Sequence, residues 1–193
     1  MKNKFLLFSV KDIISNPIKA WETIDSEYKP VISTRNGFLL PLIVLVSFSA
    51  MAGSLIYTNS ELSPVYSIFE GIKCFILFYF SVYASAYMVT KITYPLDLGK
   101  NFESAFRLIV YSMVPLFICQ LFSRFFESLL FINILSLYGL YIFWTGAEKM
   151  FNPPAYKKMP LLISSAVIFV VIFVGTEYIL TKLTDKIFHA FFS

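Results

Sequence analysis

The residues that could carry chemistry in this sequence recur at helical intervals instead of forming a catalytic set. One group is spaced by four residues, so a helix would place its members on one face: Glu103, Arg107, Tyr111 and Pro115. Glu103 and Arg107 stand in the favourable order for an ion pair four residues apart. Pro115 cannot donate a backbone hydrogen bond, which predicts a kink in that helix.

Two further groups share a helical face in the same way. One alternates spacings of three and four: Tyr138, Tyr141, Thr145 and Glu148. The other is spaced by four: Tyr79, Tyr83, Tyr87 and Lys91. The phenols could bond one another and backbone carbonyls and so hold helices together. Alternatively, two of the faces could line a polar binding pocket formed by Glu103, Arg107, Tyr111, Pro115, Tyr138, Tyr141 and Glu148.

Residue combinations typical of enzymes and metal sites are missing from the sequence. His189 is the single histidine, which excludes paired-histidine metal motifs and argues against a serine–histidine relay. Cys74 and Cys119 lie in apolar segments and do not make a zinc site with it. No Gly-x-Ser-x-Gly or glycine-rich phosphate-binding loop is present. We expect a protein that is not an enzyme and has no catalytic residue, metal or cofactor.

The composition is that of an integral membrane protein. Of 193 residues, 58% are hydrophobic and 15% are charged, whereas a soluble domain has roughly 45–50% and about 25%. The net charge of +4 comes from basic residues spread between apolar segments, with no run of five. Such a distribution excludes a nucleic-acid-binding tail and is typical of charges that set membrane topology.

The apolar segments are long enough for an all-α membrane protein. A spanning helix needs about 20 mostly apolar residues. Five segments meet or approach this length: 38–57, 69–90, 108–123, 128–147 and 160–180. We therefore expect a five-transmembrane-helix bundle over 38–193, preceded by a short segment over 1–37 and without a separate soluble domain.

Lysine and arginine residues predict the orientation of the bundle. Twelve of the sixteen lie before the first expected span, after the second or after the fourth, and four lie on the other side. Because cytoplasmic loops carry the excess of Lys and Arg, we expect the N-terminus in the cytoplasm and the C-terminus outside. An odd number of spans requires the two ends to lie on opposite sides of the membrane, which agrees with this orientation.

The N-terminal segment predicts an amphipathic helix. Asn16 is suited to cap it, Pro17 fits its first turn and Pro30 ends it. Its apolar residues are spaced by three or four and form one stripe: Ile14, Ile18, Trp21, Ile24 and Tyr28. The helix could lie in the membrane interface with Trp21 at headgroup level, or it could pack against the cytoplasmic face of the bundle.

Three short patterns resemble the prokaryotic branch of the Yip (Ypt/Rab-interacting protein) family. They are Asn16-Pro17 with Trp21 and Ile24, then 102–107 leading into Tyr111-Ser112-x-x-Pro115, and Tyr138-x-x-Tyr141 followed by Gly146. The resemblance implies five membrane helices, a cytosolic N-terminus, short loops and a bacterial inner membrane. Eukaryotic members are associated with Rab-type GTPases through a longer N-terminal region, from which this short segment departs.

These observations favour a non-enzymatic membrane scaffold or adaptor that acts through its cytoplasmic face. Its partners would be membrane lipids and a protein at that face, and no nucleic acid is expected. The small residues Ser49 and Gly53 favour close approach of helices within one chain, and a homo-oligomer formed through them is the alternative. The alternative is a small transporter or channel component that uses the polar pocket. A filled cytoplasmic mouth would favour the scaffold, and a wet cavity reaching the midplane would favour transport. A lipid-modifying enzyme is the least supported alternative, because no nucleophile–base pair is present.

Overall fold

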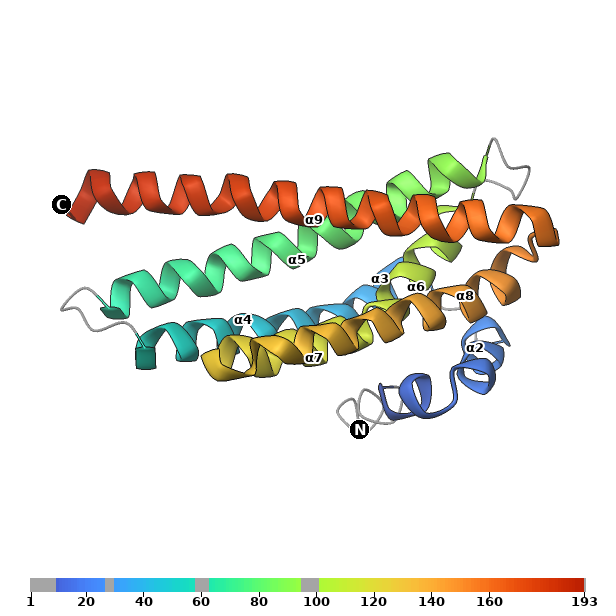
Figure 1. Cartoon of the computed structure of the whole chain (residues 1–193), viewed down its shortest axis with the longest axis horizontal. Helices are drawn as coiled ribbons and strands as arrows, with labels where there is room; N and C mark the ends of the chain where they lie inside the picture. Colours follow the sequence, from blue (N-terminus) through green and yellow to red (C-terminus); the bar gives the residue numbers. More distant parts are fainter. Residues whose placement is uncertain (1–9, 27–29, 58–62, 95–100, 193) are drawn as a thin grey trace.

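The computed structural model of the chain describes residues 10–26, 30–57, 63–94 and 101–192, and this part is helical without a β-strand (Figure 1). Residues 10–15 form a short helix before the first labelled one. The elements that follow are α2 (Pro17–Ser26), α3 (Val31–Thr34), the π-helical turn η1 (Arg35–Leu39), α4 (Leu40–Tyr57), α5 (Ser63–Thr93), α6 (Phe102–Ser112), α7 (Val114–Phe125), the 3₁₀-helical η2 (Glu127–Leu137), α8 (Tyr138–Phe151) and α9 (Ala155–Phe192).

The helices confirm a multi-span, all-α membrane protein. Four continuous helical stretches of the described chain are long and apolar enough to cross a bilayer: Val31–Tyr57, Pro64–Thr93, Ser128–Phe151 and Ala155–Phe188. Helices α6 and α7 pass the same test as a pair and would make the fifth span. They are bent by 42° with respect to each other, so the number of spans is four or five.

The bend between α6 and α7 is the kink that Pro115 predicts. Met113 separates the two helices, with φ −82° and ψ 0°. Pro115 lies in the first turn of α7, where its missing N–H removes no intrahelical bond and its fixed φ suits a helix start. The proline therefore begins a new helix instead of interrupting an old one.

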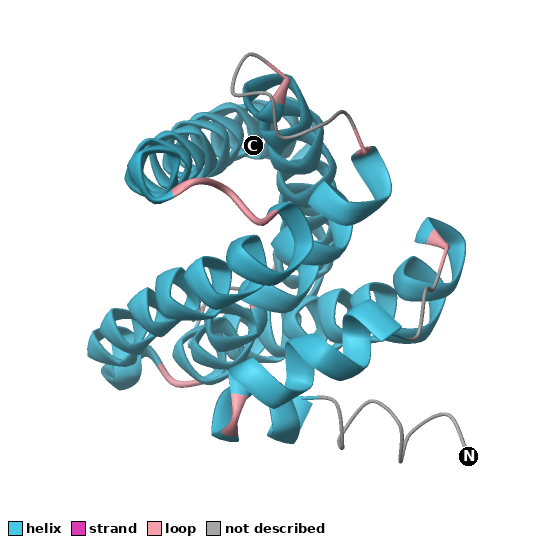
Figure 2. Ribbon diagram, turned by 90° about the vertical axis from the view of Figure 1, so that its right-hand side faces the viewer, coloured by secondary structure: helices cyan, strands magenta, loops and turns pink. Residues whose placement is uncertain are grey.

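The helices define two ends of the bundle (Figure 1). The α2 end carries α2, the beginnings of α3, α6 and α9, and the final turns of α5 and α8; Figure 2 looks onto this end. The far end carries the last turn of α4, the connection from α7 to η2 and the final turn of α9. Helix α9 packs mainly along α5, and α8 packs against α6.

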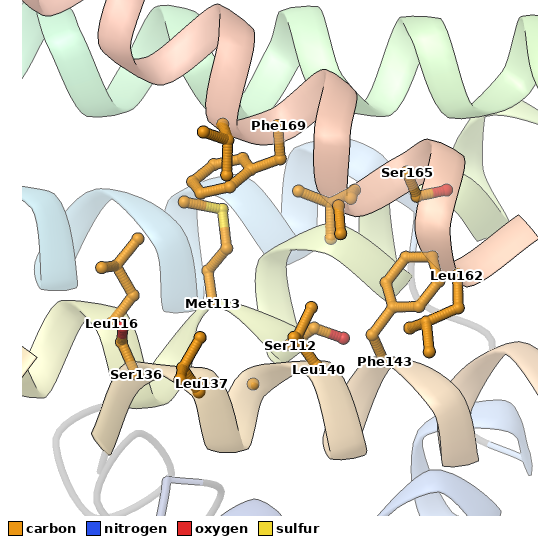
Figure 3. A pocket seen from close by; sticks show the side chains of 14 residues that line it. Ser112, Met113, Leu116, Ser136, Leu137, Leu140, Phe143, Leu162, Ser165 and Phe169 are labelled. Carbon is orange, nitrogen blue, oxygen red and sulfur yellow. The ribbon is translucent and has the colours of Figure 1, made fainter. Parts of the chain in front are cut away.

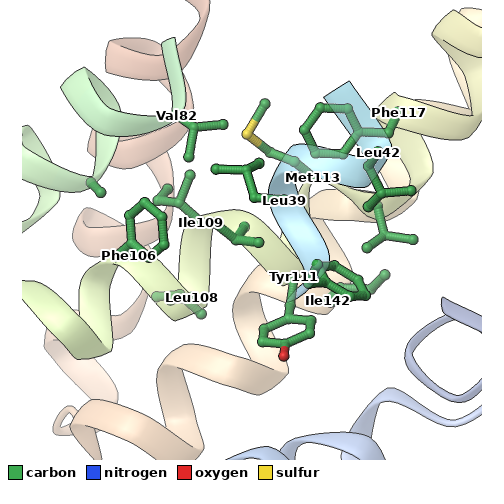
Figure 4. Close-up of a cluster of buried hydrophobic side chains, with 14 of the residues drawn as sticks. Leu39, Leu42, Val82, Phe106, Leu108, Ile109, Tyr111, Met113, Phe117 and Ile142 are labelled. Atoms are coloured by element: carbon green, nitrogen blue, oxygen red, sulfur yellow. The ribbon is translucent and has the colours of Figure 1, made fainter. Parts of the chain in front are cut away.

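Aliphatic and aromatic side chains from α4, α5, α6, α7 and α8 form the core. Phe106, Val82, Leu39 and Ile142 are fully buried, and they surround the bend between α6 and α7 together with Met113 (Figure 4). In contrast, the outer sides of η2 and α9 expose large apolar side chains over much of their length. This distribution suits a bundle surrounded by lipid hydrocarbon.

Close approach of α4 to α7 uses the small residues that could also have served dimerisation. A Cβ atom on Gly53 would lie 2.0 Å from the carbonyl oxygen of Arg124. One turn earlier, the Ser49 hydroxyl donates a hydrogen bond of 2.5 Å to the Leu121 carbonyl. Both small residues therefore pack helices of the same chain.

Candidate functional site

Trp21 fastens α2 to the bundle. Its side chain is 1% exposed, and its indole N–H donates a 3.0 Å hydrogen bond to the Ile142 carbonyl of α8. A Cβ atom on Gly146 would lie 2.4 Å from Cε2 and Cζ2 of the indole ring. The absence of a side chain at Gly146 thus makes the notch that holds Trp21.

Trp21 packs against the bundle, which is one of the two arrangements expected for this helix; its position at headgroup level stays a prediction. The buried residues of this region are Ile13, Pro17, Ala20 and Trp21, whereas Ile18 is 57% exposed. The reason is local: the helix over 10–15 ends at Asn16 and α2 begins at Pro17. This break rotates the buried face away from the stripe that one continuous helix would have formed. Tyr28, the last residue of that stripe, lies outside the described residues.

Asn16 acts as the predicted cap of α2. Its side-chain oxygen Oδ1 accepts a hydrogen bond of 3.3 Å from the backbone N–H of Lys19. Such a bond satisfies one of the donors that a helix start leaves without an intrahelical acceptor. The cap fixes where α2 begins and so which of its residues face the bundle.

Arg107 holds the other end of α2. Its side chain is 3% exposed, and its Nη1 donates a hydrogen bond of 3.4 Å to the Ile24 carbonyl in the last turn of α2. A cation is favourable there because the final carbonyls of a helix carry partial negative charge. Glu103, one turn before Arg107, is half-buried in the first turn of α6. Its backbone N–H donates a 3.0 Å bond to the capping side chain of Asn101.

Tyr111 fills the space between α2 and the beginning of the first span. It is 3% exposed and its ring meets Trp21 edge-on, with centroids 5.9 Å apart. On its other side lies the Phe38 ring, 4.6 Å away. Pro115, one turn further, is also buried. The face that carries these residues is therefore packed with aromatic and aliphatic groups.

The tyrosines and the carboxylate of α8 serve neighbouring elements. The Tyr138 hydroxyl donates a 3.0 Å hydrogen bond to the Ile14 carbonyl of the first helix, and the Tyr138 and Tyr141 rings lie 5.6 Å apart. Both rings are substantially exposed, at 37% and 47%. Glu148 forms an ion pair with Lys158, which bridges the connection from α8 to α9.

The two predicted faces are thus linked through the N-terminal helices and not across an open pocket. Arg107 and Tyr111 are buried beside α2, whereas Tyr141 lies on the exposed side of α8. Glu148 and Trp21 do share a shallow depression of about 230 Å³ with Ile18, Glu22, Thr145 and Lys149. The depression lies at the α2 end and is bordered by both α2 and α8.

A polar network at the far end joins α7, η2 and α9. The Gln120 amide donates a 3.1 Å hydrogen bond to the side-chain oxygen of Asn133. Arg124 donates through Nε to Gln120 at 2.8 Å and pairs through Nη2 with Glu177 at 3.3 Å. Glu177 therefore connects α9 to α7.

The sequence did not indicate a cleft between the α6–α7 bend, α8 and α9. This cleft has a volume of about 200 Å³ and a mostly apolar lining (Figure 3). Three serines interrupt the lining: Ser112, Ser136 and Ser165. They come from three separate helices, so only the packing of those helices brings them to one cleft.

The comparisons with known proteins place this geometry in a family. No curated protein and no solved structure matches the chain. The family model described as the Yip1 domain matches residues 11–176, which run from the first helix through most of α9. That match covers most of the 193 residues and includes both the helices that bury Trp21 and the bent pair α6–α7. The chain therefore belongs to the Yip1 domain family.

Proposed function

We propose that this membrane protein of the Yip family is a non-enzymatic scaffold or adaptor that acts through its α2 end, and that this end faces the cytoplasm. The observation that carries the proposal is the packing of the Trp21 ring against Gly146. Because α2 covers Arg107 and Tyr111 at this end of the bundle, the end presents a protein surface and not an entrance for a solute.

The distribution of charge supports the orientation. Most basic residues of the described chain belong to segments at the α2 end in Figure 1, namely the two N-terminal helices, η1, the last turn of α5, α6, the end of α8 and the start of α9. They are Lys11, Lys19, Arg35, Lys91, Arg107, Lys149, Lys157 and Lys158. The segments towards the far end, the first half of α5, the end of α7 and the last turns of α9, carry fewer: Lys73, Arg124, Lys182 and Lys186. An excess of Lys and Arg marks the cytoplasmic side of a membrane protein, so the C-terminus would lie outside. A bacterial inner membrane suits this compact form.

The outward face of α2 is the part of this end that a protein partner would meet. Ile18, Lys19, Glu22 and Asp25 are exposed there. An apolar residue among charges of both signs suits a small recognition surface with a polar rim. Docking by Trp21 and Arg107 on the opposite face would hold this surface in one orientation.

The transporter alternative receives less support from the same contacts. Transport needs a polar path that reaches the middle of the membrane, and here Arg107 and Tyr111 are buried against α2 and η1. The cleft between the α6–α7 bend, α8 and α9 has a mainly apolar lining. It suits hydrocarbon better than an ion or a polar solute.

In-cell photo-crosslinking would test the adaptor role. A photoreactive amino acid at Glu22 should crosslink to one partner protein, and the same amino acid at Asp25 should crosslink to that same partner. Trp21→Ala should abolish both adducts, because α2 is then no longer held against the bundle. The matched control position is Val171, which is 64% exposed on the membrane-facing side of α9. Substrate-dependent flux in reconstituted vesicles that is lost in a stably folded Tyr111→Phe protein would contradict the scaffold and favour transport.

A further inference from the structure

We infer that the cleft between the α6–α7 bend, α8 and α9 binds one phospholipid, with an acyl chain in the cleft and the phosphate at Lys158. The inference is independent of the adaptor role, because it rests on a different part of the molecule. The cleft volume of about 200 Å³ exceeds the roughly 150 Å³ of an apolar cavity that holds benzene. It is therefore large enough for a stretch of acyl chain.

The cleft opens to the membrane and not to water. Leu137 and Val170 line it and are 62% and 56% exposed. Both belong to helical stretches that are long and apolar enough to span the bilayer. Side chains at that depth are surrounded by hydrocarbon, so the molecules that can reach the cleft laterally are lipids.

Two buried hydroxyl groups in the cleft point to a ligand with a hydrogen-bond acceptor. Ser112 and Ser165 are 7% and 3% exposed, and neither hydroxyl has a hydrogen-bond partner among the described residues. Figure 3 shows both side chains in the wall of the cleft. An unpaired buried hydroxyl is costly in an apolar setting. Both hydroxyl oxygens present less than 1 Å² of accessible surface, so the ester carbonyl of a phospholipid would accept a bond from either serine once its side chain turns about χ1. A plain hydrocarbon would accept none.

Lys158 lies along the same face of α9 as the cleft. Lys158, Leu162, Ser165 and Phe169 are spaced by four, three and four residues, which places them on one helical stripe. Lys158 stands about 10 Å along the axis from Ser165, given a rise of about 1.5 Å per residue. Phe143 and Leu162 line both the cleft and a smaller cavity that includes Lys158 and Glu148. The lysine is thus at the end of the cleft that faces the membrane surface.

The charge near Lys158 favours a phosphate group. Lys158 pairs with Glu148, and Lys149 and Lys157 stand next to these two residues in the sequence. Glu22 borders Glu148 and Lys149 from the α2 side, so three lysines face two carboxylates in this corner. The surplus of positive charge would attract an anionic headgroup of the adjacent leaflet. A lipid phosphate could share Lys158 with Glu148, and the second negative charge would then be compensated by Lys157 or Lys149.

Lipid photo-crosslinking tests this site on the full chain. The protein is reconstituted into phosphatidylcholine vesicles that contain phosphatidylglycerol with a diazirine on one acyl chain, and adducts are located by mass spectrometry. We expect adducts to concentrate on Met113, Phe143 and Phe169. Ala166→Phe, which fills the cleft, should lower them several-fold, and Val167→Phe on the exposed side of α9 should not. A milder Ala166→Leu serves if the larger residue disturbs folding.

The polar contacts are tested separately. Ser112→Ala combined with Ser165→Ala should reduce cleft adducts, whereas Ser164→Ala, whose hydroxyl bonds to the Pro160 carbonyl, should leave them unchanged. Lys158→Gln should remove the preference for labelled phosphatidylglycerol over equally labelled phosphatidylcholine. Adducts spread evenly over the outer side of α9 and insensitive to Ala166→Phe would overturn the site, and an unchanged headgroup preference would overturn the role of Lys158.

Discussion

The indole ring of Trp21 lies in a notch whose floor is Gly146, so close that a Cβ atom there would be 2.4 Å from the ring. Residues far apart in the sequence thus fix where the N-terminal helix docks. The Tyr111 ring and the Ile142 carbonyl complete the notch. This notch holds α2 against the end of the bundle and so orients the outer face of α2. It therefore links the fold to the proposed function.

Gly146→Ala should displace α2. The added methyl group would collide with the Trp21 ring and with Leu108, whose Cδ1 lies 2.6 Å from the same Cβ position. Overpacking of this kind costs about 1–3 kcal/mol. Limited proteolysis in nanodiscs should show faster cleavage within residues 10–26. Gly175→Ala is the matched control, since nothing lies within 4 Å of a Cβ there, and equal cleavage of the two variants would argue against the notch.

Arg107→Met should loosen the C-terminal turn of α2 while it keeps most of the apolar volume of the side chain. Loss of a hydrogen bond from a charged donor costs about 1.5–3 kcal/mol, although the bond to Ile24 is long at 3.4 Å. Hydrogen exchange over residues 17–26 should accelerate. Lys19→Met on the exposed side of α2 is the control, and unchanged protection in both proteins would contradict the assigned role.

Tyr138→Phe should weaken the attachment of the first helix. The substitution removes the donor to the Ile14 carbonyl and leaves the ring contact with Tyr141. We expect a loss of about 0.5–1.5 kcal/mol, seen as faster hydrogen exchange over residues 10–15. Tyr156→Phe, at a site that is 74% exposed, should have no such effect. If both variants behave alike, the bond to Ile14 is not what holds the helix.

The ion pair between Arg124 and Glu177 should couple α7 to α9. Reversing one charge, in Arg124→Glu or Glu177→Arg, should lower the midpoint of thermal unfolding, because each leaves two like charges close together. The double exchange should recover much of that loss, and a double-mutant cycle isolates the coupling free energy. Additive losses in the double variant would show that the two side chains do not interact.

The elements of the fold could be predicted because their signals are local. Long apolar runs predict the spans, and Pro115 predicts the bend. The seat of Trp21 could not be predicted, since its hydrogen-bond partner Ile142 lies 121 residues away. The cleft is also non-local, because its three serines come from α6, η2 and α9, which are distant in the sequence.

The predicted polar pocket also depends on contacts between residues that are distant in the sequence. Helical spacing correctly grouped Arg107 with Tyr111 on one face, both of which are buried. Spacing alone could not reveal that α2 covers this face, because the break at Asn16 changes which N-terminal residues point inward. The pattern therefore grouped Arg107 with Tyr111, but their contacts with Ile24 and Trp21 of α2 depend on residues distant in the sequence.

Fluorescence quenching of Trp21 tests the docked α2 most directly. In a Trp144→Phe protein Trp21 is the single tryptophan, since the chain has two. The protein is reconstituted into vesicles. If the Trp21 ring packs against Gly146, its fluorescence should be quenched only weakly by aqueous iodide and by lipids brominated near the headgroup. Gly146→Ala in the same background should raise the quenching. Strong quenching by the brominated lipids before that substitution would place Trp21 in the membrane interface and contradict the closed, scaffold-like end of the bundle.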